Sequence, residues 1–81
     1  MKHTVQLFAA ARELAGSTTV ELELPEGATI GTLRAALLVQ TPALEKLARH
    51  LTFAMNAEYV GDSTVIAHGA ELACIPPVSG G

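Results

Sequence analysis

The sequence has few of the residues that build several common kinds of site. Among its 81 residues there is one cysteine, Cys74, no tryptophan, and only three other aromatic residues, Phe8, Phe53 and Tyr59. A lone cysteine excludes an internal disulfide framework and any site that needs several thiolates. The five basic residues are scattered and are outnumbered by eight acidic ones, which gives a net charge of −3. Without a basic run or aromatic clusters we expect no nucleic-acid partner.

Long apolar runs are also missing. No stretch approaches the roughly eighteen consecutive apolar residues of a membrane span. The first residues lead directly into a strand-like pattern without the apolar region of a signal peptide. We therefore expect no membrane partner and a cytoplasmic location. With 49% hydrophobic and 16% charged residues, the composition is typical of one small globular domain.

Hydrophobic periodicity predicts short strands alternating with helices. Gly16 is a natural end for the first helical turn. Thr41 followed by Pro42 resembles an N-cap and first-turn proline that open a second helix after the long one. The expected strands span residues 3–8, 18–24, 52–56, 64–67 and 71–75, and the expected helical segments span 9–15, 29–40 and 42–50.

This order predicts an α+β fold, with a mixed sheet and helices packed on one of its faces. The last strand can lie centrally beside the first. Its residues are apolar on both faces, because Leu72 and Cys74 point one way and Ala73 and Ile75 the other. The helices can cover only one face, so we expect a partner to cover part of the second.

The most informative segment is Pro76-Pro77-Val78-Ser79-Gly80-Gly81. Two prolines lack backbone donors and end the preceding strand. Two glycines contribute no packing, but they let an extended chain enter a narrow channel. The residue types therefore predict a body over 1–75 and a flexible tail over 76–81 whose terminal carboxylate is the working group.

Several segments resemble one family. Val5-Gln6-Leu7-Phe8-Ala9 and Arg12-Glu13-Leu14-Ala15-Gly16 resemble its opening strand and helical turn, and Met55-Asn56-Ala57-Glu58-Tyr59-Val60 resembles its third strand. Together with the Pro-Pro-Val-Ser-Gly-Gly tail they are similar to the MoaD family, the small subunits of molybdopterin synthase, and through it to the ubiquitin-like β-grasp sulfur carriers. One departure is Ala70, which follows Gly69 where the family usually has an acidic residue.

The resemblance implies a reaction at the C-terminal carboxylate. An E1-like adenylating enzyme, MoeB-like, uses ATP to convert the Gly81 carboxylate to an acyl-adenylate, and sulfur from a persulfide donor replaces AMP to give a thiocarboxylate. The thiocarboxylate then donates sulfur to cyclic pyranopterin monophosphate for the dithiolene of molybdopterin. On this basis the chain binds no cofactor or metal itself, and it acts as a non-catalytic sulfur-donor subunit.

The resemblance also implies a large partner subunit, MoaE-like, which supplies the catalytic acids and bases. Two small and two large subunits form a heterotetramer. In this scheme Gly81 carries the chemistry and Pro76, Pro77, Val78, Ser79 and Gly80 form the inserted tail. We expect Phe8 and Ile75 to form an apolar patch for both partners on the sheet face away from the helices, with Arg12 helping to orient them.

Two other functions remain open. The same thiocarboxylate could serve another pathway, such as thiamine synthesis or tRNA thiolation. A Gly-Gly terminus is also shared with ubiquitin-like protein modifiers, or the tail could be idle on an interaction module.

A few residues are predicted to be structural. Cys74 reads as a buried hydrophobic residue in an apolar strand. We expect Tyr59 to pack with its hydroxyl group hydrogen-bonded, and Arg34 to lie on the side of its helix away from the apolar stripe. The three histidines lack the spacing of metal ligands.

Overall fold

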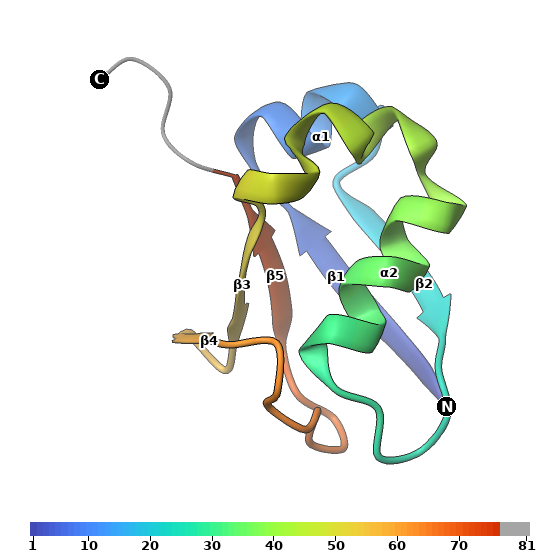
Figure 1. Ribbon diagram of the computed structural model, residues 1–81, viewed down its shortest axis with the longest axis vertical. Coiled ribbons are helices and arrows are strands. Elements are labelled where there is room, and N and C mark those ends of the chain that lie inside the picture. Colours follow the sequence, from blue (N-terminus) through green and yellow to red (C-terminus); the bar gives the residue numbers. More distant parts are fainter. Residues whose placement is uncertain (77–81) are drawn as a thin grey trace.

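The computed structural model describes residues 1–76 of the chain. Five strands, two α-helices and one 3₁₀ helix make up this part (Figure 1). They are β1 (Lys2–Leu7), α1 (Ala9–Ala15), β2 (Thr19–Glu23), α2 (Ile30–Gln40), the 3₁₀ helix η1 (Pro42–His50), β3 (Thr52–Met55), β4 (Glu58–Val60) and β5 (Leu72–Ile75).

The strands form one mixed sheet in the order β2-β1-β5-β3-β4. β5 lies in the centre, parallel to β1 and antiparallel to β3. β2 and β4 are the edges, each antiparallel to its neighbour. Figure 1 shows α2 running across one face, with α1 and η1 together at one end of the molecule. This arrangement is a ubiquitin-like β-grasp, and it confirms the predicted fold and the central position of the last strand.

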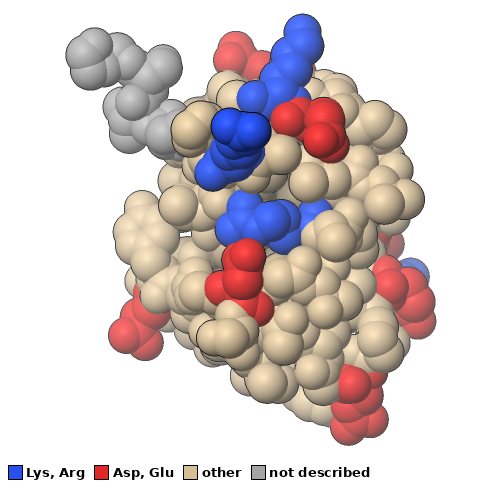
Figure 2. All heavy atoms as spheres, in the orientation of Figure 1, with Lys and Arg blue, Asp and Glu red and all other residues tan. Residues whose placement is uncertain are grey.

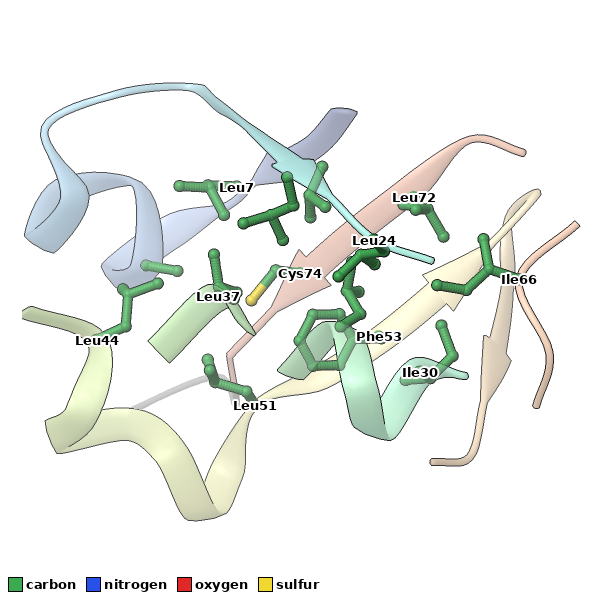
Figure 3. Packing of buried hydrophobic residues seen from close by; sticks show 14 of the residues in the cluster. Leu7, Leu24, Ile30, Leu37, Leu44, Leu51, Phe53, Ile66, Leu72 and Cys74 are labelled. Atoms are coloured by element: carbon green, nitrogen blue, oxygen red, sulfur yellow. The ribbon is translucent and has the colours of Figure 1, made fainter. Parts of the chain in front are cut away.

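The core lies between the sheet and the helices (Figure 3). β1 alternates strictly, with His3, Val5 and Leu7 buried and the residues between them exposed, because successive side chains of a strand point to opposite faces. Leu37 and Leu44 reach the same cluster from α2 and η1, each with no exposed surface. Burying such side chains stabilises the fold by roughly 1.5–3 kcal/mol each.

Local sequence explains the end of α1 and the start of α2. Gly16 ends α1 at φ 71°, a left-handed conformation that glycine adopts without strain. Thr29 caps α2 by accepting a hydrogen bond from the Thr32 amide. Gly31 lies so close to the following loop that its amide donates to the Asp62 carbonyl at 2.9 Å. A Cβ atom at Gly31 would lie 3.3 Å from that oxygen, a tighter contact than most Cβ atoms make, so the close approach favours glycine.

The structure corrects three expectations about the second half of the chain. Residues 42–50 are helical with Pro42 in the first turn, as predicted, and the helix is of the 3₁₀ type. The predicted N-cap was wrong, because within the described chain the Thr41 side chain caps no backbone amide; the Thr41 carbonyl instead accepts from Leu44. Residues 55–60 are not one strand, because a two-residue turn divides them between β3 and β4. The expected strand at 64–67 is reduced to a single bridge between Thr29 and Val65.

Arg34 was expected on the exposed side of α2, and this was also wrong. Its side chain is 25% exposed and reaches from α2 to three other segments. The guanidinium donates to the carbonyls of Ala48 (3.3 Å) and Leu51 (2.7 Å) at the end of η1. It also pairs with Asp62 at 3.0 Å and lies 5.0 Å from the centroid of the Phe53 ring. Arg34 therefore joins α2, η1 and β3.

The remaining ion pairs are exposed. In residues 1–76 they join the N-terminus to Glu23 and Lys2 to Glu21, and the His68 ring lies 3.5 Å from the Glu26 carboxylate. On the face in Figure 2, charges of both signs are interspersed among uncharged residues. Pairs of this kind contribute little to stability. Within the same residues, no helix has both the length and the apolar character needed to cross a membrane.

Candidate functional site: a hollow on the open face of the sheet

The sheet face away from the helices carries a shallow hollow. Small residues in the middle of the sheet form its floor. Strand pairing places Gln6, Ala73, Ala54 and Tyr59 in one row across β1, β5, β3 and β4. The two middle residues are alanines, whose side chains end at Cβ. The longer side chains of Gln6 and Tyr59 stand on either side of them. The row is therefore low in the centre of the sheet and raised at its margins.

The hollow has a volume of about 310 Å³. Its lining is mainly apolar and comes from four strands and the residues beside them. The lining residues are Gln6, Phe8, Ala54, Ala57, Tyr59, Glu71, Leu72, Ala73 and Ile75. Its apolar lining suits aliphatic or aromatic side chains of another protein.

Phe8 and Ile75 lie at the same hollow, as their neighbouring strands require. The Phe8 amide donates to the Cys74 carbonyl at 3.2 Å, which continues the β1–β5 pairing one residue past the end of β1. The Phe8 side chain is 42% exposed, so it is not part of the buried core. The structure thus brings the two residues together, while their role in partner binding stays a prediction.

Arg12 lies beside the hollow, not inside it. With Phe8 and Gln6 it lines a separate, smaller depression toward β2. Its side chain has no ion pair among the residues that the structure describes. The backbone carbonyl of Arg12 accepts the hydrogen bond that ends α1. A role in orienting a partner remains a prediction.

The tail begins next to this surface. The Thr52 hydroxyl donates to the Ile75 carbonyl, which fixes the end of β5 against the start of β3. Pro76, which the sequence assigned to the tail, is buried. Pro77, Val78, Ser79, Gly80 and Gly81 lie outside the described residues. The body therefore places an apolar hollow beside the point from which the predicted reactive segment continues.

Tyr59 is a surface residue that the sequence analysis misjudged. It is 71% exposed, and its hydroxyl group has no hydrogen-bond partner within residues 1–76. The sequence analysis treated residues 55–60 as one strand and did not foresee the turn between β3 and β4. The face on which Tyr59 lies could therefore not be assigned from the alternation of its neighbours. With that hairpin in place, Tyr59 pairs with Ala54 and lies on the open face.

Asn56 fixes the β3–β4 turn at one margin of the hollow. The Asn56 side-chain oxygen accepts a hydrogen bond from the backbone amide of Glu71 at 2.9 Å. The backbone amide of Asn56 donates to the Glu71 carbonyl at 2.8 Å. These two bonds tie the β3–β4 turn to the start of β5. Ala70, where the family pattern has an acidic residue, packs partly against the core after a turn closed by its amide and the Ala67 carbonyl.

Cys74 belongs to the core and not to the site. Its side chain has no exposed surface, as predicted. Burial raises the pKa of its thiol to about 11, and the positive charge of Arg34 opposes this shift. In residues 1–76 no group of three His, Cys, Asp or Glu side chains could hold a metal ion. The buried Cys74 thiol therefore offers no nucleophile at the hollow.

The Cys74 thiol gives a testable pH dependence. Its ordinary pKa is 9.0, so between pH 9 and 11 an unfolded chain loses a proton that the folded chain retains. Folding stability therefore falls as pH rises through this window and does not depend on this thiol below it. Denaturant unfolding of the wild type should show a steeper decline than Cys74→Ala. Rapid alkylation of the native thiol at pH 8 would contradict its burial.

Comparison with known proteins agrees with the fold. Residues 5–81, nearly the whole chain, match the ThiS family. The chain belongs to the ThiS family. Among its ThiS relatives is the molybdopterin synthase sulfur carrier subunit of Arabidopsis thaliana, 43% identical over 77 residues that cover 95% of this chain and 80% of the relative. The same-named subunit of Chlamydomonas reinhardtii is 40% identical over the full length of both chains.

A third ThiS relative has a different name. Small archaeal modifier protein 1 of Haloferax volcanii is 39% identical over 84 residues, which cover 94% of this chain and 97% of the relative. A crystal structure of that protein superposes with a TM-score of 0.87 at 36% identity, and the match covers all of both chains. The β-grasp body is thus common to relatives named as sulfur carriers and one named as a modifier.

Proposed function

We propose that the chain is the sulfur carrier subunit of a molybdopterin synthase. Membership of the ThiS family over residues 5–81 carries this proposal. The name shared by the Arabidopsis and Chlamydomonas relatives supports the pathway. The Pro-Pro-Val-Ser-Gly-Gly segment and the apolar hollow beside its root support the mode of action.

The working group in this proposal is the Gly81 carboxylate. A carboxylate is a poor electrophile, so an activating enzyme uses ATP to form the acyl-adenylate and releases pyrophosphate. A persulfide sulfur then attacks the acyl carbon, the carbon–oxygen bond to AMP breaks, and an acyl disulfide forms. Two electrons from a thiol cleave the disulfide and leave the thiocarboxylate. ATP serves the activating enzyme and is not held by this chain.

The body contributes docking rather than catalysis. A partner side chain in the hollow would contact the floor formed by Ala54 and Ala73, with Phe8 and Ile75 nearest the tail. Burial of this apolar surface offsets the cost of ordering the tail inside the partner. The large synthase subunit supplies the acids and bases. Two sulfur atoms are needed for each dithiolene, which fits a complex of two small and two large subunits.

Intact-mass measurement tests the carrier chemistry. The protein is incubated with ATP, a matching activating enzyme and a persulfide donor. We expect a mass gain equal to replacing one oxygen atom by sulfur. A variant lacking Gly81, whose described body is unchanged, is the control and should show no gain. An unchanged wild-type mass with an activating enzyme that is active on another carrier would contradict the proposal.

The archaeal relative supports a second candidate, a protein modifier that forms isopeptide bonds from the same acyl-adenylate. The two functions differ in the fate of the acyl group. A tagged chain isolated from cells under reducing, denaturing conditions should migrate as one species if it is only a sulfur carrier. A ladder of reductant-resistant conjugates, lost when Gly81 is deleted, would support the modifier function.

A further inference from the structure

Three residues other than glycine adopt positive φ in the described chain: Ala9 at 50°, Asn56 at 53° and Ala57 at 69°. The left-handed region is unfavourable for residues with a Cβ atom, and asparagine tolerates it better than alanine. Backbone strain of this kind tends to gather at functional sites. Asn56 and Ala57 form the β3–β4 turn at the margin of the open face, whereas Ala9 opens α1.

The turn itself accounts for Asn56 but not for Ala57. β3 and β4 are joined by a two-residue loop with positive φ at both positions, for which Asn-Gly is the favoured pair. Asn56 occupies the first position and makes both hydrogen bonds to Glu71. At the second position, glycine would adopt the same conformation without strain. The fold gives no reason for alanine there.

The hollow gives such a reason. Ala57 is exposed to solvent, yet it lines the hollow together with Tyr59 and Glu71. We propose that Ala57 is a contact residue of the docking surface, kept in a strained conformation because its methyl group forms part of the wall. The occupant is an aliphatic or aromatic side chain of the large synthase subunit, seated between Ala57 and Tyr59 over the alanine floor. This inference rests on the proposed function, whose docking surface it refines.

The inference predicts opposite effects of one substitution. Ala57→Gly relieves the strain and should raise the Tm by about 2–6 °C. The same change removes one methyl group from the interface and should raise the Kd for the large subunit about fourfold. A residue with only a structural role would not improve stability while weakening binding.

The chain offers a matched control. Ala9→Gly also relieves a left-handed alanine, but Ala9 is not among the residues that line the hollow. Its Tm should rise similarly while the Kd stays unchanged. As a second variant, Ala57→Asn introduces a residue that tolerates positive φ better than alanine but places an amide in the apolar wall. It should raise the Tm by less than Ala57→Gly and bind more weakly than Ala57→Gly.

The test combines calorimetric Kd values for the purified large subunit with thermal unfolding of each variant, and it includes Phe8→Asp. Ala57→Gly with a higher Tm and an unchanged Kd would overturn the inference, as would a lower Tm. If Phe8→Asp weakens binding and Ala57→Gly does not, the docking surface stands and only the role of Ala57 fails. If neither weakens binding, the docking surface is wrong and the inference falls with it. The mass measurement on Gly81 is independent of both outcomes.

Discussion

Replacing Arg34 by alanine is expected to destabilise the protein by about 3 kcal/mol, a large share of the roughly 5–10 kcal/mol typical of a small domain. The guanidinium donates to the carbonyls of Ala48 and Leu51, which end the 3₁₀ helix and lose their donor in the variant. Stacking on Phe53 adds a further contribution at a partly buried position. Urea unfolding measures the difference directly.

Two matched variants divide this effect. Arg34→Met keeps an unbranched side chain near Phe53 but donates no hydrogen bond, so it should recover only the packing part. Asp62→Asn removes the charge of a 59%-exposed partner and should cost less than about 1 kcal/mol, as exposed ion pairs do. A loss below about 1 kcal/mol for Arg34→Ala would show that the contacts to η1 contribute little.

Phe8→Asp should weaken binding to the large synthase subunit by at least about thirtyfold, the effect of losing an interface hot spot. The aromatic ring is 42% exposed in the free protein and lines the hollow beside Ile75. A carboxylate in its place would lose its hydration inside an apolar interface. The fold should persist, because Phe8 holds β5 through its backbone amide.

Val39→Asp is the matched control for this experiment. Val39 is an apolar residue on α2 with 82% exposure, and it does not line the hollow. The same change of charge there should leave the Kd unaltered. Calorimetric titration of both variants, with circular dichroism to establish folding, gives the comparison. If Phe8→Asp folds and binds normally, the open face is not the docking surface. If the variant unfolds, Phe8 contributes to the core.

Much of the fold could be predicted from the sequence because its signals are local. Alternation predicted β1 and β2, the apolar run before the two prolines predicted β5, and Gly16 predicted the end of α1. The Thr29 cap of α2 was not predicted. The β3–β4 turn was missed since its second residue, Ala57, is not the glycine that usually marks such a turn. The 3₁₀ geometry of residues 42–50 was missed since it depends on packing and not on the apolar pattern.

The site was predictable only in part. Phe8 and Ile75 were placed together because parallel pairing of the first and last strands requires it. The hollow depends on Ala54, Ala73 and Tyr59 meeting across three strands. No local segment of the sequence determines the register that brings them together. Arg34 shows the same limit, because its partners lie 14, 17 and 28 residues away in the chain.

The central position of β5 determines how the domain can form. Without it the sheet falls into two separate hairpins, β1–β2 and β3–β4, and an isolated hairpin is marginally stable at best. Pairing Val5 with Leu72 closes nearly the whole chain in one event, which slows folding relative to helical domains of similar size. A chain cut short before residue 72 would therefore expose two loose hairpins to proteases, and would not yield a smaller folded body.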